Sequence, residues 1–503
     1  MTCAGFSSHW LAKNMQYTCK RCTPPPTSSL PLVDTPPPVG NRIVVQENAD
    51  DTLPAMEDSF TVSPPPSPVH ASSPRRNVVH HSPDHAHLAS HRPDPQPAPS
   101  DQLPFSTEDL FSTRVATLRH IPKTAQKEMA SLKNAVWNDV LCDPENLNAW
   151  TVALAHTKLT LFLPPGKKSF PQKSKVVGER IRAFKEGRLH KLWLQATKRP
   201  SRILRVASSP PTPSNNVKRA TMLAQEGQAG RAAKALVSQG LDFDSATAIN
   251  NMQALHPQSP PPPPLPPPPA APYSFTDTEV MEALNSFHST SAGGPSGERP
   301  AHIQKTVNAD RSNNFLPTLT RLINLLAAGK APAAVTPYIC GGNLFAALKK
   351  SGGHRPIAVG ESLRRLTAKC VTRKATNDAK ESLAPHQLGV GVKGGAEAII
   401  HAVNAVFHDD NIADEEKWVL QVDFSNAFNG ISREEMQVRV REYCPKAAAW
   451  TESCYSTASH LFFNQTKISS STGGDFRINE FILFYSVVAS SRLLFHSLVG
   501  IWV

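Results

Sequence analysis

Runs of proline constrain this chain more than any other feature, because they limit where helices and sheets can form. Proline lacks a backbone N–H and has a fixed φ angle, so consecutive prolines cannot take part in helix or sheet ladders. The chain contains 47 prolines in 503 residues, many of them at residues 24–104 and 257–272. We expect residues 24–104 to form a disordered Pro-, Ser- and His-rich linker, and residues 256–272 a stiff polyproline linker at a domain boundary. SH3- or WW-type domains are candidate partners for these runs.

Two segments outside the proline runs have the periodicity of folded structure. In residues 105–255, the stretch LNAWTVALAHTKLTLFL has helical apolar spacing, and STEDLF begins with a helix-capping pattern. After the polyproline run, Thr276 is followed three positions later by Glu279, which predicts a capping box. Further helical stripes precede KWVLQVDF, a short apolar run typical of a buried strand. This order predicts a helical region followed by an α/β or α+β domain.

The charge balance favours a polyanionic partner, above all nucleic acid. The net charge is +12, and Lys and Arg are dense in residues 167–205, where Phe184 and Trp193 are interleaved. Cations neutralise phosphates and aromatic faces stack on bases, so residues 105–255 are predicted to be a basic helical region with a candidate nucleic-acid surface. A solvated basic helix or a nuclear-localisation patch explains the same pattern. The N-terminus has no apolar signal segment, so we expect an intracellular protein of the nucleus or cytoplasm.

Residues 1–23 contain four candidate zinc ligands, Cys3, His9, Cys19 and Cys22. The closing Cys-x-x-Cys has the spacing of a structural zinc site, whereas the opening Cys-x5-His is irregular. The segment resembles the back half of a PHD-like finger, and we interpret it as a partial zinc-finger remnant that binds Zn²⁺. The alternative is a disordered N-terminus with incidental cysteines.

The stretch VLQVDFSNAFNGIS places Asp423 at the end of a predicted buried strand. A buried carboxylate has to be paired or bound to a metal ion. Two other stretches precede it in order, KKSGGHRPIAVGESLRRLTAK at 349–369 and HQLGVGVKGGAEAIIHAV at 386–403. Together with SAGGPSGERPAHI at 291–303, the three resemble the reverse transcriptase domain of non-LTR (LINE-type) retrotransposons. The resemblance covers residues 273–472 and implies an incomplete right-hand polymerase fold, an α+β fragment of fingers and partial palm over residues 273–473.

The resemblance implies a two-metal nucleotidyl-transfer site. Asp423 corresponds to the first of three Mg²⁺ carboxylates, and the backbone carbonyl of Phe424 adds a ligand. Phe428 corresponds to the aromatic side chain under the sugar, which excludes a 2′-OH and selects deoxynucleotides. The alternatives are that Asp423 is a helix N-cap or turn residue and that Phe428 belongs to the core.

The same resemblance implies contacts with an RNA or DNA template and an incoming dNTP. Arg355 corresponds to the arginine that pairs with the triphosphate, a role that suits a guanidinium fork, and Lys349 or Lys350 assists it. Gln387 and Gly389 correspond to the element beside the template. For Arg355 the alternative is a surface ion pair.

Two later elements of the family are missing. An adjacent pair of aspartates should follow the first, but Asp475 is the only aspartate after Asp423 in the chain. The template-cradling motif matches only at Thr472 and Gly473. We therefore expect a catalytically incomplete member of the family, because one aspartate cannot hold two Mg²⁺ ions against their hydration shells. The alternative function is a non-enzymatic nucleic-acid-binding or Pro-rich adaptor protein.

Residues 474–503 form an apolar tail that does not continue the family pattern. The stretch at 481–503 is about as long as a bilayer-spanning helix, but Arg492 would stand near its middle. An arginine there costs about 2.5–3.5 kcal/mol on insertion. We interpret the tail as aberrant, arising from a frameshift, a retained intron or a gene-model error, and we do not expect a membrane partner. A tail anchor and a buried helix are the alternatives.

Overall fold

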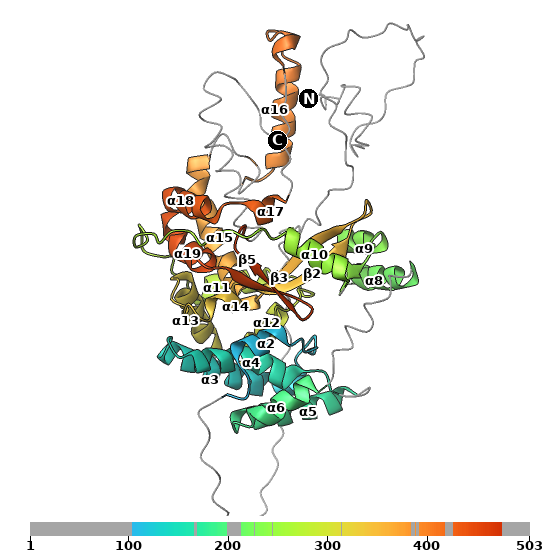
Figure 1. The fold of residues 1–503 in the computed structure, drawn as a ribbon, viewed down its shortest axis with the longest axis vertical. Coiled ribbons are helices and arrows are strands. Elements are labelled where there is room, and N and C mark those ends of the chain that lie inside the picture. Colours follow the sequence, from blue (N-terminus) through green and yellow to red (C-terminus); the bar gives the residue numbers. More distant parts are fainter. Residues whose placement is uncertain are drawn as a thin grey trace, which may run out of the picture. The chain divides into compact units, whose positions relative to one another are not determined.

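The computed structural model describes residues 103–164, 169–198, 213–225, 227–243, 245–312, 314–383, 388, 392–417 and 426–474. The predictions for the zinc ligands Cys3, His9, Cys19 and Cys22, for the linker at 24–104 and for the tail from 475 lie outside these residues. Within them the fold is a mixture of many helices and one small mixed sheet (Figure 1). The predicted combination of helices and strands is confirmed at this level.

The first described helices form a packed group. They are α2 (Thr107–Ser112), α3 (Gln126–Cys142), α4 (Leu147–Leu161), α5 (Phe170–Lys185) and α6 (Leu189–Thr197). Helix α4 contacts α3, α5 and α6 (Figure 1). The predicted cap of α2 is present, since the Ser106 hydroxyl accepts from the Asp109 N–H at 3.0 Å and the Asp109 carboxylate accepts from the Ser106 N–H at 2.9 Å. Local side-chain chemistry therefore starts this helix as the sequence predicts.

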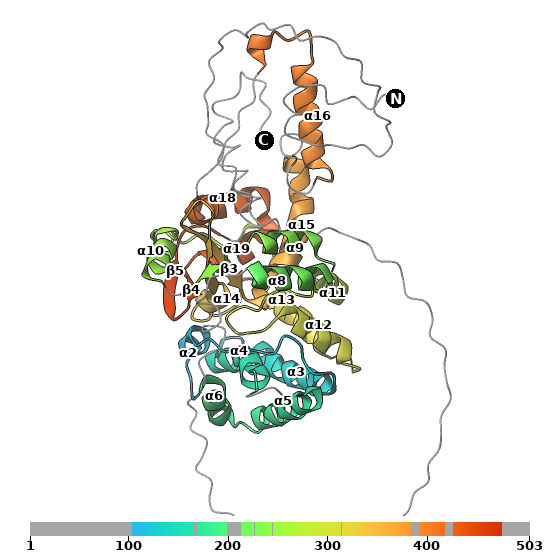
Figure 2. The ribbon, with the colours of Figure 1, turned by 90° about the vertical axis from the view of Figure 1, so that its right-hand side faces the viewer.

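A helical hairpin and a two-residue strand follow. The hairpin pairs α8 (Pro213–Gln225) with α9 (Ala229–Leu236), which lie side by side in Figure 2. Strand β1 (Leu241–Asp242) and α10 (Ala246–Ala254) come next. Helix α10 contacts strands β3 (His354–Gly360) and β5 (Thr466–Ser470), so it covers one face of the sheet.

The helices after the polyproline run match the predicted ones. Thr276 and Glu279 form the expected capping box at the start of α11 (Asp277–Asn285). The second predicted helix is α13 (Phe315–Ala327), and Gly329 follows it with a positive φ of 69°. The third and fourth are α15 (Ser362–Leu383) and α16 (Gly395–Phe407). The remaining ones are α12 (Pro300–Ala309), α14 (Thr336–Ile339), α17 (Ala427–Gly430), α18 (Arg433–Tyr443), α19 (Ala448–Tyr455) and the 3-10 turns Lys123–Ala125, Asp414–Glu416 and Pro445–Ala447.

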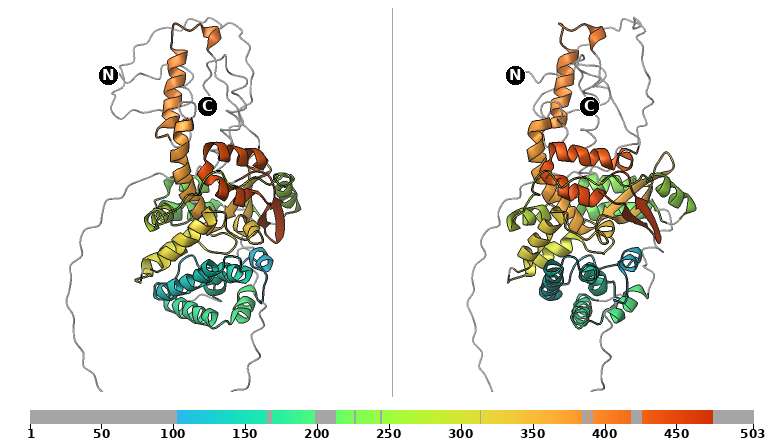
Figure 3. Two further views of the ribbon diagram at one scale, coloured as in Figure 1. Left: turned by 90° about the vertical axis from the view of Figure 1, so that its left-hand side faces the viewer. Right: turned by 60° about the vertical axis from the view of Figure 1, so that its left-hand side comes forward.

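The sheet is organised around strand β2 (Gly342–Leu348). Strand β3 pairs antiparallel with the whole of β2 as a hairpin. On the other edge of β2, the strand β4 (Ser459–Phe463) pairs parallel at Gly342 and Asn343, and β1 pairs antiparallel at Ala346 and Ala347. Strand β5 forms a second hairpin with β4 (Figure 3). The sheet thus brings residues 342–360 next to residues 459–470, about a hundred positions further along the chain. The predicted strand KWVLQVDF lies outside the described residues except for its first lysine.

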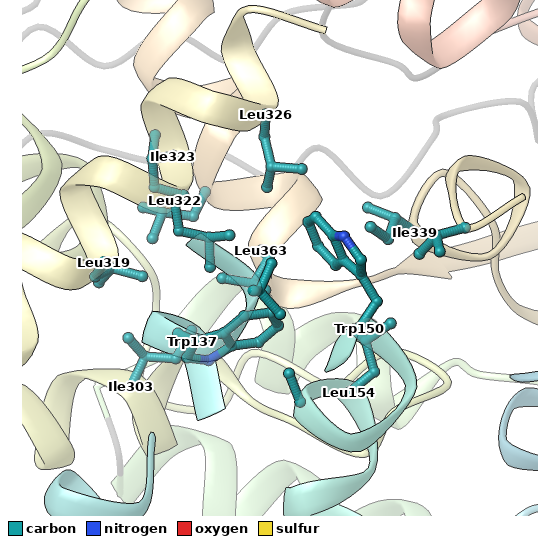
Figure 4. Close-up of a cluster of buried hydrophobic side chains, with 14 of the residues drawn as sticks. Trp137, Trp150, Leu154, Ile303, Leu319, Leu322, Ile323, Leu326, Ile339 and Leu363 are labelled. Atoms are coloured by element: carbon teal, nitrogen blue, oxygen red, sulfur yellow. The ribbon is translucent and has the colours of Figure 1, made fainter. Parts of the chain in front are cut away.

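One hydrophobic core joins the first helices to the segment after the polyproline run. It extends from Phe105 to Phe462 and includes Trp137 and Trp150, whose rings meet edge to face at a centroid distance of 6.1 Å. Figure 4 shows these two rings among leucine and isoleucine side chains of α13, α14 and α15. The boundary predicted at 256–272 therefore lies between two segments that share a core. A second, smaller core lies between α10 and the sheet.

Buried charges hold the loop SAGGPSGERP between the helices and the sheet. Lys133 of α3 and Glu298 of the loop form a salt bridge, and His156 Nε2 lies 3.6 Å from the same carboxylate. Burial alone would raise the pKa of Glu298, but the Lys133 ammonium and His156 outweigh it and hold that pKa well below its usual range. On the other side of the loop, the Ser296 N–H and hydroxyl each donate to the Glu361 carboxylate at 2.6 Å.

Three other buried groups in the same region have shifted pKa values. Burial, with the nearby Lys133 charge, lowers the pKa of His302 to about 3. Burial raises the pKa of Glu361 to about 7 and lowers that of Lys158 to about 7. Lys158 donates to the Leu110 and Thr113 carbonyl oxygens, so its head group is satisfied inside the protein. Basic residues counted as surface charge in the sequence are thus part of the interior.

These shifts predict that the protein loses stability in acid. Glu298 and His302 have lower pKa values in the folded protein than in the unfolded chain, where they are about 4.5 and 6.5. The stability that depends on these two groups is therefore present above the unfolded pKa values and is lost as the pH falls below them. Glu361 has the opposite sign, because its raised pKa costs stability as the pH rises through about 7. Between pH 7 and 4.5 the two effects oppose each other, so the steepest loss is expected below about pH 4.5. Urea unfolding midpoints measured from pH 8 to pH 3 test this, and a midpoint that stays level or rises below pH 4.5 contradicts it.

Candidate functional site

The structure describes half of the residues predicted to form the site. Asp423, Phe424, Gln387 and Gly389 lie outside the described residues, so their predicted roles stay predictions. Lys349, Lys350, Arg355 and Phe428 are described. They fall into two places, the β2–β3 hairpin and the short helix α17.

The β2–β3 hairpin carries the predicted nucleotide-binding cations. Lys349 and Lys350 are exposed at its turn, where Gly352 and Gly353 take positive φ angles of 90° and 79°. Arg355 is half-buried in β3 directly opposite Ala347, and Ile357, two residues further, is exposed. Since side chains alternate along a strand, Arg355 and Ile357 share one face of the hairpin.

The opposite face of the hairpin is covered. His354 hydrogen-bonds with the Asp242 carboxylate at 3.2 Å and with the Asn251 side chain at 2.9 Å, which ties β3 to β1 and α10. Leu344 and Ala346 of the same face are buried in the second core. The covered face therefore fixes the hairpin, and the face with Arg355 and Ile357 is the one partly open to solvent.

Phe428 lies where two stretches singled out in the sequence, residues 419–432 and residues 472–473, meet. The Gly474 N–H donates to the Phe428 carbonyl at 3.0 Å, and the Gly473 N–H donates to the Ile431 carbonyl at 2.9 Å. The Thr472 hydroxyl donates to the Asn429 carbonyl at 2.7 Å. The end of the Asp423 motif is thus bonded to the Thr472–Gly473 pair, more than forty residues away in sequence. The Phe428 side chain is half-buried, which is compatible with both readings of this residue.

Glycine is required at position 473 for this contact. Its φ is +68°, and a Cβ at this position would lie 2.3 Å from the Phe428 carbonyl oxygen. Any other residue would therefore be strained in its backbone and would clash with α17. The predicted match at Thr472 and Gly473 thus has a physical reason in this chain, the close approach of two backbones.

Arg433 is a residue of this region that the sequence reading missed. Its guanidinium is buried and donates to the carbonyl oxygens of Gly473, Thr457 and Ser470 at 3.0, 2.8 and 2.7 Å. It also lies over the Tyr455 ring at 5.3 Å. Burial lowers the pKa of Arg433 to about 10. Arg433 fastens α18 to the end of β5 and to the Thr472–Gly473 turn. No sequence signal indicated this role, because the three acceptors are backbone carbonyls.

The basic helices α5 and α6 offer cations, but their aromatic side chains are used in packing. Phe184 is buried, and the Trp193 ring packs on Phe105 at a centroid distance of 4.8 Å. Neither ring is thus placed to stack on a base. Exposed cations along these helices are Lys175, Arg182, Lys185, Arg188, Lys191 and Lys198. Of the predicted nucleic-acid surface, only the exposed cations therefore remain as candidate contacts.

The described residues include no metal-binding cluster and no helix that could span a membrane. Among them, no three His, Cys, Asp or Glu side chains come together in a way that could hold a metal ion. The predicted Mg²⁺ ligands Asp423 and Phe424 and the predicted Zn²⁺ ligands lie elsewhere in the chain, so neither ion is tested. No helix within the described ranges has both the length and the apolarity needed to cross a bilayer.

Comparison with known proteins gives no relative: no protein-family model matches the chain, and no curated protein matches it in sequence.

Proposed function

We propose that this chain derives from an RNA-directed DNA polymerase of the non-LTR retrotransposon type and that residues 273–473 form its fingers and part of its palm. The observation that carries the proposal is the bonded contact of residues 428–431 with residues 472–474. In the family pattern these stretches end the first aspartate motif and begin the template-cradling motif. Both stretches are expected to contact the template or the incoming nucleotide, so a polymerase site would place them side by side.

The arrangement before this contact also supports the proposal. A hairpin with cations at its turn and Arg355 on its partly open face is followed by helices α15 and α16 and then by the Asp423 motif. A guanidinium and two ammonium groups on one hairpin suit a triphosphate or a nucleic-acid backbone. The rigid backing from β1 and α10 holds that hairpin in place.

The proposed chemistry assigns a role to each candidate. Arg355 and Lys350 bind the phosphates of the incoming nucleotide, Phe428 lies under its sugar, and Gln387 and Gly389 contact the template. Asp423 and the Phe424 carbonyl hold Mg²⁺, which supplies charge stabilisation for the attacking and leaving oxygens. Because only Asp475 follows Asp423 among the aspartates of these 503 residues, we propose that this chain binds template without extending a primer.

Template binding is expected to depend on the β2–β3 hairpin. Replacing Lys350 and Arg355 by alanine should weaken binding of a single-stranded RNA by about tenfold and reduce the salt slope, because each lost cation removes counterion release. The matched control replaces two exposed cations of α5, Lys175 and Lys185. Fluorescence anisotropy at several salt concentrations measures both. Equal losses in the two double variants, or a loss only in the α5 variant, contradict the proposal and favour a basic adaptor.

The purified chain is expected to show no primer extension with Mg²⁺ and dNTPs. Two metal ions need more carboxylates than Asp423 supplies. A radiolabelled primer on an RNA template gives the measurement, and Asp423→Ala is the matched variant. Incorporation by the original chain that disappears with Asp423→Ala would overturn the claim of inactivity while supporting the polymerase ancestry.

A further inference from the structure

The polyproline run is held at its first end by the region next to the candidate site. The Thr472 hydroxyl oxygen lies 2.8 Å from the Pro257 carbonyl oxygen and shares its one proton between this carbonyl and that of Asn429. The Gln258 amide donates to the Ser469 carbonyl at 2.8 Å. The Ser259 N–H donates to the Ser471 hydroxyl at 2.8 Å. The run therefore starts along the end of strand β5 and not in open solvent.

The second end of the run is held by side chains of α18, α19 and α15. Arg441 donates to the carbonyl oxygens of Pro266 and Pro267, the latter at 3.3 Å. Its guanidinium is oriented by the Glu452 carboxylate, at 2.6 and 3.0 Å. Beyond the run, the Tyr273 hydroxyl donates to the Asp378 carboxylate at 2.9 Å. The prolines between these anchors form an arch that both ends keep in place.

Most of the arch is exposed to solvent. Pro262 and Leu265, three residues apart, are half-buried, while all other residues from 260 to 269 are exposed. The run is therefore partly covered at these two residues and presents its other prolines to solvent. Consecutive prolines favour a polyproline helix by sterics alone.

We propose that residues 260–269 are a docking site for a domain of the WW type, which binds polyproline in an aromatic-lined groove. Such grooves bind a preformed helix that loses little entropy on binding, and the anchors at both ends lower that loss further. The sequence from 257 to 275 contains no Lys, Arg, Asp or Glu. A domain whose groove binds an arginine of its ligand in an acidic pocket therefore has no arginine to bind in this segment. The exposed residues of the run offer only apolar proline rings. This proposal is independent of the polymerase ancestry.

The test uses the full chain and WW domains chosen beforehand for binding a synthetic peptide of residues 257–272. The chain should bind such a domain at least as tightly as the peptide does. Replacing the exposed Pro263 and Pro264 by alanine should weaken binding by about tenfold or more. The matched control is Pro213→Ala, an exposed proline at the start of α8. Titration calorimetry gives the dissociation constants.

A second variant tests whether the anchoring of the proline run adds to the affinity that its sequence alone provides. Arg441→Gln removes the anchor at Pro266 and Pro267 and should lower the affinity of the chain toward that of the free peptide, while circular dichroism confirms that it folds. The proposal is wrong if the chain binds more than about tenfold weaker than the peptide, because the body would then mask the prolines. It is also wrong if the Pro263 and Pro264 substitutions leave the affinity unchanged.

Discussion

Glu298→Gln is expected to lower the free energy of unfolding by about 3–5 kcal/mol, the cost of leaving a buried ammonium without its counter-charge. Lys133 is fully buried in α3 and faces the Glu298 carboxylate from the SAGGPSGERP loop. The amide keeps the size and one acceptor oxygen but not the charge. Urea unfolding followed by circular dichroism gives the measurement.

A double substitution separates the loss of the pair from a general defect in the loop. Replacing Lys133 by Met and Glu298 by Leu together removes both charges, and such replacements are often neutral or stabilising. We expect the double variant to recover most of the loss, giving a coupling energy of at least about 2 kcal/mol in the cycle. The matched control is Arg439→Gln, which breaks the surface pairs with Glu435 and Glu442 and should cost under about 1 kcal/mol. A Glu298→Gln variant as stable as the control would contradict the account.

Arg433→Leu is expected to cost about 2–3 kcal/mol, because the buried Gly473 carbonyl and two partly exposed carbonyls lose their donor, and a buried carbonyl left without one costs about 1–3 kcal/mol. The three carbonyls belong to Gly473, Thr457 and Ser470, so the loss falls on the contact between α17 and the Thr472–Gly473 turn. Arg433→Lys keeps the positive charge but not the guanidinium fork, so its free energy of unfolding should lie between those of the original chain and Arg433→Leu.

Hydrogen exchange locates the effect of the Arg433 substitution. The Gly473 N–H, which donates to the Ile431 carbonyl at 2.9 Å, should lose protection in Arg433→Leu. Amides inside α13, far from Arg433 in the main core, should keep theirs while the protein stays folded. Uniform loss of protection in both places would mean that Arg433 supports the whole fold and does not specifically support the site.

Local features of the fold could be predicted from the sequence. The caps at Ser106 and Thr276 depend on one side chain and a backbone N–H three residues away, and both are present. The end of α13 at Gly329 depends on a residue that accepts a positive φ. Such signals need no knowledge of what the element packs against.

Features set by long-range packing could not be predicted in this way. The sequence does not distinguish Lys133 and Lys158 from other lysines of the helices, and only the fold shows that both are buried. Phe184 and Trp193 stood among basic residues, but they pack into the core or against it. Periodicity cannot identify the partner that satisfies a buried charge, because that partner comes from a distant segment.

The candidate site was predicted in part, and by resemblance. The sequence related Phe428 and Gly473 to two family motifs, and the structure adds that their backbones are bonded to each other. Arg433 was missed, because its three acceptors are backbone carbonyls that carry no sequence signal.

Cross-linking of bound RNA tests the central claim most directly. A single-stranded RNA containing photoreactive uridines is bound to the full chain at low salt, irradiated, and the modified peptides are identified by mass spectrometry. The account predicts cross-links within residues 342–360, on the hairpin that carries Lys350 and Arg355. Cross-links confined to residues 169–198, or none at all under conditions where RNA binds, would contradict a polymerase-derived template site.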